Sequence, residues 1–285
     1  MSGRVLVIGA TGSVGSAVVD ELIRAGQKIN AATRTPQSVG SSNDSVENVE
    51  FDFERPLTFE KALTGVDRVF LIARPGDDHA DVVALPFIDE MQRLNVSRVV
   101  NLTAMGAETR DDMALRKIER YLEDSGLGFT HLRPNFFMQV FSTGLLLADI
   151  RSTGGIHIPA ADAKLSYIDV RDIAAVAARA LIDESHIGKA YTLTGGSALD
   201  HYEIAQHISD AADRRIDYVP ISEDTARSGL ERAGLSASRT ERLIGFYRLV
   251  RQGFCAPVSV DVEAILGRHP ISFTEFANDF ASCWR

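Results

Sequence analysis

The sequence predicts an α/β protein with a doubly wound parallel sheet and a small, mostly helical subdomain. The order of the predicted elements and the composition of the chain lead to this prediction. Apolar runs of strand length alternate with amphipathic stretches of helix length between residues 4 and 195, and strands separated by helices form parallel sheets through crossover connections. With 285 residues, of which 45% are apolar and 24% charged, the chain has the composition of a globular protein with one large domain, or one domain and an appendage.

Each predicted element follows from its local pattern. RVLVI at 4–8 is a short β-branched run, and SAVVDELIRAG at 16–26 is amphipathic and ends in glycine, which signals the end of a helix. The same reasoning predicts further strands at 28–33, 47–53, 67–73, 97–104, 129–134 and 191–195. Further helices are predicted at 57–63, 80–94, 113–126 and 169–183.

The stretch GATGSVG at 9–15 predicts a dinucleotide-binding turn. Gly9, Gly12 and Gly15 follow the first strand and open the first helix. Glycines there let the chain turn tightly, expose backbone N–H groups to a pyrophosphate and bring the helix close to the sheet. The spacing is GxxGxxG rather than the more familiar GxGxxG, and a purely structural turn is the alternative. The context favours a Rossmann-type fold.

The second strand indicates which dinucleotide is bound. NAD sites usually carry an acidic residue about 20 residues further on, but no carboxylate occurs between Glu21 and Asp44. Instead Arg34 follows the strand, with Thr33 and Thr35 beside it. A guanidinium suits the 2′-phosphate of NADP(H), so we expect NADP(H) to be preferred over NAD(H). The alternative is a solvated arginine on a loop.

The third strand ends in FDFERP at 51–56. Asp52 could accept a hydrogen bond from the adenine amino group, and Phe53 could lie beside the adenine ring. An Asp52 that caps the following turn is an equally good interpretation.

We expect residues 1–135, completed by about 166–196, to form the Rossmann-type domain. Residues 136–165 and 197–285 are predicted to form a substrate-side C-terminal subdomain of shorter helices and loops, because strand alternation is absent from 136–165 and from residue 200 onward.

Composition argues against several classes of partner. A net charge of −9 does not suit nucleic acid or an anionic membrane, both of which need clustered lysine and arginine. No apolar run approaches the ~18 residues of a membrane span, and a strand that starts at Arg4 leaves no room for a signal peptide. Cys255 and Cys283 lack metal-ligand spacing and HExxH does not occur. We therefore expect a cytoplasmic protein without a metal site.

Several segments together resemble the NmrA-like branch of the atypical short-chain dehydrogenases/reductases. They are Gly9–Gly15, Arg34, Asp52, LTAMGAE, FTHLRPNFFMQ, SYIDVRDIAAVAARAL and YTLTGG. This branch includes NAD(P)H-dependent quinone, azo-dye and triphenylmethane-dye reductases, ergot-alkaloid iminium reductases, and redox-sensing regulators without turnover. The resemblance implies a Rossmann-type fold and NAD(P)H as cofactor.

The resemblance also implies which residues contact the cofactor. The pyrophosphate would meet the backbone around the glycine-rich turn, and Arg34 would meet the adenosine phosphate. The ribose and nicotinamide would lie at the carboxyl ends of the next strands. The implied contacts are Thr11, Gly12, Ser13 and Val14 in the turn, Ile72, Ala73 and Arg74 after the fourth strand, Thr103 and Ala104 after the fifth, and Pro134, Asn135 and Phe136 after the sixth.

The usual proton-handling pair of ketone-reducing relatives is absent. None of the six tyrosines is followed by lysine four residues later. Anchoring on ERYLEDSGLGFTHLRP, the tyrosine position of ordinary members falls on Asp111, and the lysine position of related benzylic-ether reductases falls on Leu115. Lys117 is two residues away, about 200° around the helix, and is interpreted as a solvated residue.

Without that pair, we expect an acceptor that needs no dedicated acid. Quinones, azo groups, iminium ions and triarylmethyl cations are electron-poor, so catalysis can rest on positioning against the nicotinamide. NFFMQVF supplies an aromatic lining, although Met138 and Phe141 are equally explained as core. His157 and His131 are lone histidines for which a structural role is the leading alternative. The substrate-binding candidates are Met105, Phe136, Phe137, His157 and Tyr167.

The sequence therefore predicts an NADPH-dependent reductase of an electron-poor small molecule that works without a Tyr–Lys pair, as a monomer or homodimer. No catalytic residue is assigned. The alternative is a non-catalytic NADP(H)-sensing regulator that acts through a protein partner. An isomerase on the same fold ranks last, because that chemistry normally uses the missing tyrosine as its base.

Overall fold

The computed structural model describes residues 3–36, 44–74 and 77–285. The chain forms two compact units. Unit 1 comprises Met1–Pro134 and Val170–Leu193, and unit 2 comprises Asn135–Asp169 and Thr194–Arg285. The chain thus leaves unit 1 after its sixth strand and returns for one further helix and strand.

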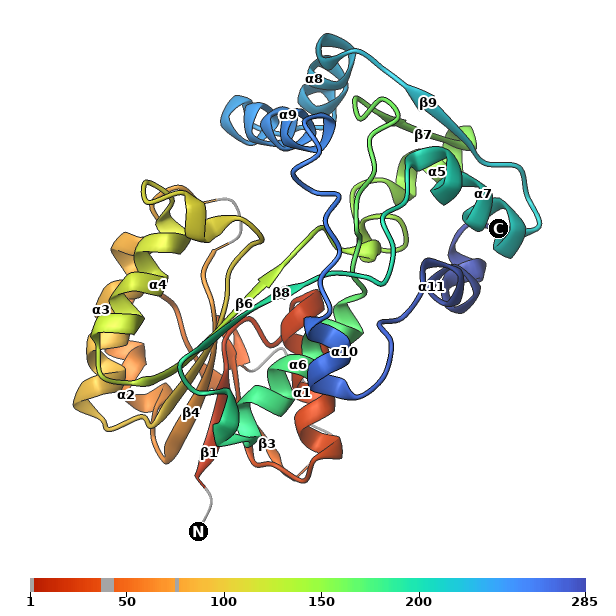
Figure 1. The fold of residues 1–285 in the computed structure, drawn as a ribbon. Helices are drawn as coiled ribbons and strands as arrows, with labels where there is room; N and C mark the ends of the chain where they lie inside the picture. Colours follow the sequence, from red (N-terminus) through yellow and green to blue (C-terminus); the bar gives the residue numbers. More distant parts are fainter. Residues whose placement is uncertain (1–2, 37–43, 75–76) are drawn as a thin grey trace. The chain divides into compact units, whose positions relative to one another are not determined.

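Unit 1 contains a seven-stranded sheet in the order β3-β2-β1-β4-β5-β6-β8, and its strand pairs are parallel (Figure 1). The chain runs outward from β1 to β3, then crosses back and runs outward again from β4. This confirms the predicted doubly wound sheet and places the point where strand order reverses between β1 and β4. The strands are β1 Arg4–Val7, β2 Ile29–Thr33, β3 Val46–Glu50, β4 Val66–Ile72, β5 Arg98–Leu102, β6 Gly128–Pro134 and β8 Lys189–Leu193.

Helices cover both faces of this sheet (Figure 1). One face carries α1 (Ser13–Arg24) and α6 (Val170–Ile182), which pack against each other. The other face carries α2 (Phe59–Ala62), α3 (Ala80–Arg93) and α4 (Ala114–Asp124). Because both faces are covered, central strands can be apolar throughout, and β5 is buried along its whole length. Short 3-10 helices lie at Pro56–Thr58, Ala107–Thr109 and Glu184–His186.

The two largest differences between predicted and observed boundaries in unit 1 are three residues each. The first helix was predicted to begin at residue 16, but α1 begins at Ser13 and includes Gly15. Glycine is a poor helix former, and here it is required by close packing rather than by helix propensity. The third strand was predicted to reach residue 53 but ends at Glu50, because Asp52 caps a turn through its side chain (Asp52 Oδ1 to Glu54 N, 3.1 Å).

Unit 2 is mostly helical but contains a strand pair that the sequence did not predict. β7 (Gly155–Ile158) and β9 (Asp217–Pro220) pair in parallel. Each has four residues, which is too short for alternation to be read, and their pairing is long-range. The helices are α5 Leu147–Thr153, α7 His201–Ala212, α8 Glu223–Arg232, α9 Ala237–Arg251, α10 Asp261–Leu266 and α11 Phe273–Phe280, with 3-10 helices at Met138–Val140 and Ala281–Cys283.

The expectation of only shorter helices in unit 2 was also wrong, since α9 has 15 residues and α3 of unit 1 has 14. The core of unit 2 contains several aromatic side chains. Phe141, Phe276 and Trp284 are fully buried, and the indole Nε1 of Trp284 donates to the carbonyl of Phe141 at 2.7 Å. This bond joins the last residues of the chain to the segment that follows β6.

Candidate functional site

The glycine-rich turn brings the start of α1 closer to β1 than any side chain would allow. Gly9 has φ +69°, a conformation that favours glycine. The N–H of Gly12 donates to the Gly9 carbonyl at 2.9 Å. A Cβ built on Gly15 would lie 2.1 Å from the Gly9 carbonyl oxygen. Gly15 is therefore needed for the close helix–strand approach.

The first turn of α1 is open to an anion. The N-cap residue Gly12 has no side chain to cap the helix, and the first turn contains no acidic residue. Among the described residues, no acceptor pairs with the N–H groups of Ser13 and Val14, as expected for the first turn of a helix. Thr11, Gly12 and Ser13 are exposed. Free N–H groups, the positive end of the helix dipole and the lack of a Cβ on Gly12 all fit a bound pyrophosphate.

Arg34 follows the last residue of β2, next to β1 in the sheet. Its side chain is exposed, and within the described ranges no carboxylate pairs with it. Its neighbour Thr33 instead accepts a hydrogen bond from the N–H of Thr35, at 3.3 Å. A guanidinium that pairs with no carboxylate of the described residues suits a phosphate on the adenosine side of the turn.

Asp52 and Phe53 have structural roles that the sequence left open or did not predict. Asp52 caps the turn after β3, as in the alternative interpretation, and also lies 3.6 Å from Arg74. The ring of Phe53 packs edge-to-face on Phe51 at 4.9 Å between centroids and joins the core. Its side chain is thus part of the core, and the adenine contacts of both residues remain predictions.

Arg74 lies just beyond β4 and is held in place by acidic neighbours. Its guanidinium donates to Glu54 at 2.7 Å, and this hydrogen bond raises the pKa of Arg74. Ile72, the last residue of β4, would touch a Cβ on Gly9 at 3.1 Å, and Ala73 is buried. The residues after β4 therefore abut the glycine-rich turn, and their cofactor contacts remain predictions.

The ends of β5 and β6 are tied together. The N–H of Thr103 donates to the carbonyl of Leu132 at 2.8 Å, and the N–H of Met105 donates to that of Pro134 at 2.9 Å. The hydroxyl of Thr103 donates to Glu119 at 2.8 Å. Ala104 and Met105 are partly exposed. Thr103 has thus no free donor for a cofactor, and only its neighbours offer accessible groups.

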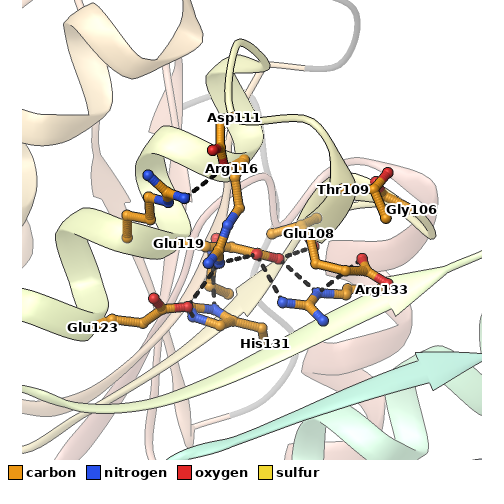
Figure 2. A network of polar contacts seen from close by, with 12 residues as sticks. Gly106, Glu108, Thr109, Asp111, Arg116, Glu119, Glu123, His131 and Arg133 are labelled. Atoms are coloured by element: carbon orange, nitrogen blue, oxygen red, sulfur yellow. Dashed lines mark hydrogen bonds and ion pairs between the residues drawn. The ribbon is translucent and has the colours of Figure 1, made fainter.

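Glu119 of α4 is the centre of a buried polar network (Figure 2). Its side chain is fully buried. Arg133 binds both carboxylate oxygens at 2.9 Å, and Arg116 binds one at 2.8 Å. Burial favours the neutral carboxyl, but the hydrogen bonds from Arg133 and Thr103 outweigh it and hold the pKa of Glu119 below its usual value. The carboxylate is therefore ionised at neutral pH.

His131 lies beside this network as a buried, neutral side chain. It is 1% exposed, and burial lowers its pKa to about 4. Its Nδ1 lies 3.4 Å from Asn101 Nδ2, and its Nε2 lies 3.4 Å from Glu123 without forming a hydrogen bond. The structural interpretation of His131 fits this position.

The positions to which the resemblance assigns the proton-handling pair have other contacts in this chain. Asp111 pairs with Arg120 at 2.6 Å at the surface. Leu115 packs against the core of unit 1. Lys117 pairs with Asp81 of α3 at 3.3 Å. No side chain at these positions takes the place of the missing acid.

Of the aromatic segment after β6, two residues belong to the core of unit 2. Met138 and Phe141 are buried, whereas Phe136 and Phe137 are partly exposed. The ring of Phe136 packs edge-to-face on Phe246 of α9, with centroids 5.9 Å apart. Sequence reasoning missed Phe246, because nothing in the local pattern of α9 indicates a partner so far away along the chain.

Three further predicted site residues have side chains that contact other residues of unit 2. The Tyr167 hydroxyl contacts the buried His201 at 3.0 Å, and Tyr167 is 4% exposed, so the structure does not support a substrate contact from it. The Asn135 amide donates to the Ser166 hydroxyl and the carbonyl of Cys255, both at 2.8 Å. His157 pairs with Asp149 of α5 at 2.8 Å, which anchors α5 to β7.

The described part of the chain contains neither a membrane-spanning helix nor a metal-binding cluster. In residues 3–36, 44–74 and 77–285, no helix is long and apolar enough to cross a membrane. The same residues contain no cluster of three or more histidine, cysteine or acidic side chains that could hold a metal ion.

Comparisons with known proteins agree with this geometry. Residues 9–184 match a family model described as NAD(P)H-binding. The chain is 32% identical to an NAD(P)H azoreductase from Xenophilus azovorans, covering 98% of this chain and 99% of the relative. The fold is shared with Citrobacter sp. triphenylmethane reductase in complex with NADP(H) (TM-score 0.84, 22% identity, 97% and 99% coverage). It is also shared with the NADPH complex of Escherichia coli quinone oxidoreductase QOR2 (TM-score 0.84, 22% identity, 97% and 99% coverage).

Proposed function

This chain belongs to the NAD(P)H-binding, NmrA-like family of atypical short-chain dehydrogenases/reductases and is an NAD(P)H-dependent oxidoreductase, and from this premise we propose that it reduces an electron-poor small molecule by direct hydride transfer from NADPH. The observation that carries the proposal is that neither proton-handling position holds the tyrosine or the lysine. They hold Asp111 and Leu115, and the nearby Lys117 is paired with Asp81. The named activities of its relatives, on azo compounds, quinones and triphenylmethane dyes, support an acceptor of this class.

The residues of the chain would bind and orient the two reactants. NADPH supplies the hydride when bound. The N–H groups at the start of α1 bind the pyrophosphate, and Arg34 binds the 2′-phosphate. An electron-poor acceptor becomes a neutral molecule or a stabilised anion when it gains hydride, and water can then supply any proton. Positioning at about 3–3.5 Å between the reacting atoms is therefore the main contribution of the protein.

Phe136 and Phe246 are the aromatic groups that we assign to the acceptor in unit 2. Both rings retain exposed surface, and they meet edge to face. Rings in this arrangement can pack against the face or the edge of a planar aromatic ligand. An acceptor with a flat, conjugated system suits this pair better than a small aliphatic carbonyl compound does.

NADPH consumption by the purified protein tests the proposal. The acceptors are a quinone, an azo dye, a triarylmethane dye, a cyclic iminium ion and a plain ketone, each with NADH in parallel and each corrected for the reaction without protein. We expect turnover with at least one of the first four. Turnover of the ketone alone would contradict the argument from the missing acid. NADPH binding without consumption of any acceptor would favour the regulatory alternative.

Replacing Arg34 with alanine is expected to weaken NADPH binding about tenfold, the range of one lost charge-assisted contact at an exposed site. Binding of NADH, which lacks the 2′-phosphate, is expected to change little. Titration of the variant with both cofactors, followed by NAD(P)H fluorescence, measures the effect. Arg24→Gln is the matched control, because Arg24 is an exposed arginine of α1 that pairs with Glu21. Equal losses for NADPH and NADH would overturn the assignment of Arg34.

A further inference from the structure

We propose that Glu119 is a positioning residue for the nicotinamide half of the cofactor and acts through Thr103 and Arg133. The proposal rests on the proposed function only in taking NADP(H) as the ligand. It explains what α4 contributes, although Asp111, just before α4, and Leu115 within it do not provide the proton-handling pair.

Sheet topology places the nicotinamide half on one side of the glycine-rich turn. Ligands of such sheets bind beyond the carboxyl ends of the strands, across the point where strand order reverses. That point lies between β1 and β4. Arg34 extends from β2, on one side of β1. If the adenosine half lies there, the nicotinamide half must lie over the ends of β4, β5 and β6.

The network fixes the ends of two of these three strands. Thr103 directly follows β5, and its hydroxyl donates to Glu119 at 2.8 Å. Arg133 is the penultimate residue of β6 and binds the same carboxylate through two hydrogen bonds of 2.9 Å. A single carboxylate of α4 thus binds residues at both strand ends, and Figure 2 shows its contact with Arg133.

The loop that leaves β5 is held by the same residues. Arg133 also lies 3.5 Å from Glu108, in the 3-10 helix that follows this loop. Met105 is bonded to Pro134 through the backbone at 2.9 Å. The partly exposed residues Ala104 and Met105 therefore lie between two fixed points, and they are the groups that can face a nicotinamide ring.

The chemistry of the network favours a positioning role over a purely stabilising one. Burying charged side chains costs solvation free energy, whereas burying apolar side chains of the same volume does not. Buried ion pairs therefore add little to the free energy of unfolding. What they fix well is geometry, because a bidentate arginine–carboxylate pair is directional. Arg116, Glu119 and Glu123 recur at helical spacing on one side of α4 and join the same network.

The test compares whole and half cofactors in binding. Thr103→Val keeps the shape of the side chain and removes only its hydroxyl. The substitution frees the end of β5 from Glu119, so this strand end must be ordered when the cofactor binds, and we expect the affinity for NADP⁺ to fall about fivefold. Binding of 2′,5′-ADP, which has no nicotinamide half, is expected to stay within about twofold. Isothermal titration calorimetry on the full chain measures both, and a hydride-transfer rate about tenfold lower is expected where an acceptor is turned over.

Conservative and distant variants complete the experiment. Thr103→Ser keeps the hydroxyl and should bind NADP⁺ as the unmodified protein does. Glu119→Gln should reproduce the selective loss and provides the test if Thr103→Val does not fold. Arg120→Gln, at a surface ion pair of α4, should change neither affinity. Equal weakening of NADP⁺ and 2′,5′-ADP, or no weakening of either, would overturn the proposal. Because these are binding measurements, the result stands whether or not an acceptor is ever reduced.

Discussion

Replacing Glu119 with alanine is expected to lower the free energy of unfolding by about 3 kcal/mol, at the lower end of the range for removing one partner of a buried ion pair. Arg133 would lose both of its short contacts and keep, within the described residues, the longer contact with Glu108 at 3.5 Å. Thr103 would lose its acceptor at 2.8 Å. The lower end applies because Arg116 keeps Glu123 as a partner at 2.8 Å.

Urea unfolding of the variant and of two comparison proteins measures this loss. Arg120→Gln removes an exposed pair of the same helix and should cost less than about 1 kcal/mol. The double variant Glu119→Leu, Arg133→Met replaces charge by apolar volume and should be more stable than Glu119→Ala. A Glu119→Ala protein as stable as the Arg120→Gln protein would show that the buried carboxylate is dispensable.

The contribution of Glu119 should also depend on pH. Its pKa is lower in the folded chain than in the unfolded chain. The stabilisation is therefore complete above the ordinary glutamate pKa of about 4.3 and is lost as the pH falls through the lower folded value. The difference in stability between the unmodified protein and Glu119→Ala should shrink in that acidic range.

Replacing Gly15 with alanine is expected to lower the free energy of unfolding by about 2–3 kcal/mol, as for an overpacked site. The new Cβ would lie 2.1 Å from the carbonyl oxygen and 2.5 Å from the carbonyl carbon of Gly9. Both are backbone atoms, so α1 must move away from the turn. The same movement displaces the N–H groups at the start of the helix, and we expect NADPH affinity to fall at least about tenfold.

Thermal unfolding and NADPH titration of Gly15→Ala measure the two losses. Gly229→Ala is the matched control, because Gly229 lies within α8 and a Cβ there meets no atom within 4 Å. Alanine favours helix more than glycine does, so the control should be stabilised by up to about 1 kcal/mol. If Gly15→Ala behaves like Gly229→Ala, the turn is not as close as the structure describes.

The sequence by itself determined the architecture of unit 1 and the class of its cofactor. Periodicity and turn residues are local signals, so the strands of the parallel sheet and the helices between them could be predicted within a few residues. The glycines at 9–15 could also be recognised, because a dinucleotide-binding turn depends on residue types at a fixed place in one βα unit. The role of Arg34 stays a prediction. The absence of a Tyr–Lys pair can likewise be read from the sequence alone.

Only the tertiary structure decided what the individual side chains do. The hydroxyl of Thr103, a residue whose cofactor contact stays a prediction, donates to Glu119, 16 positions further on. Tyr167 was predicted to contact substrate but meets His201 in the core. Phe246 comes to Phe136 from α9, and β7 finds β9 across a long stretch of chain. The physical reason is common to all four cases. A hydrogen bond, a ring contact or a short strand pair forms with whichever group the folded chain brings near. The local sequence pattern does not indicate which group that will be.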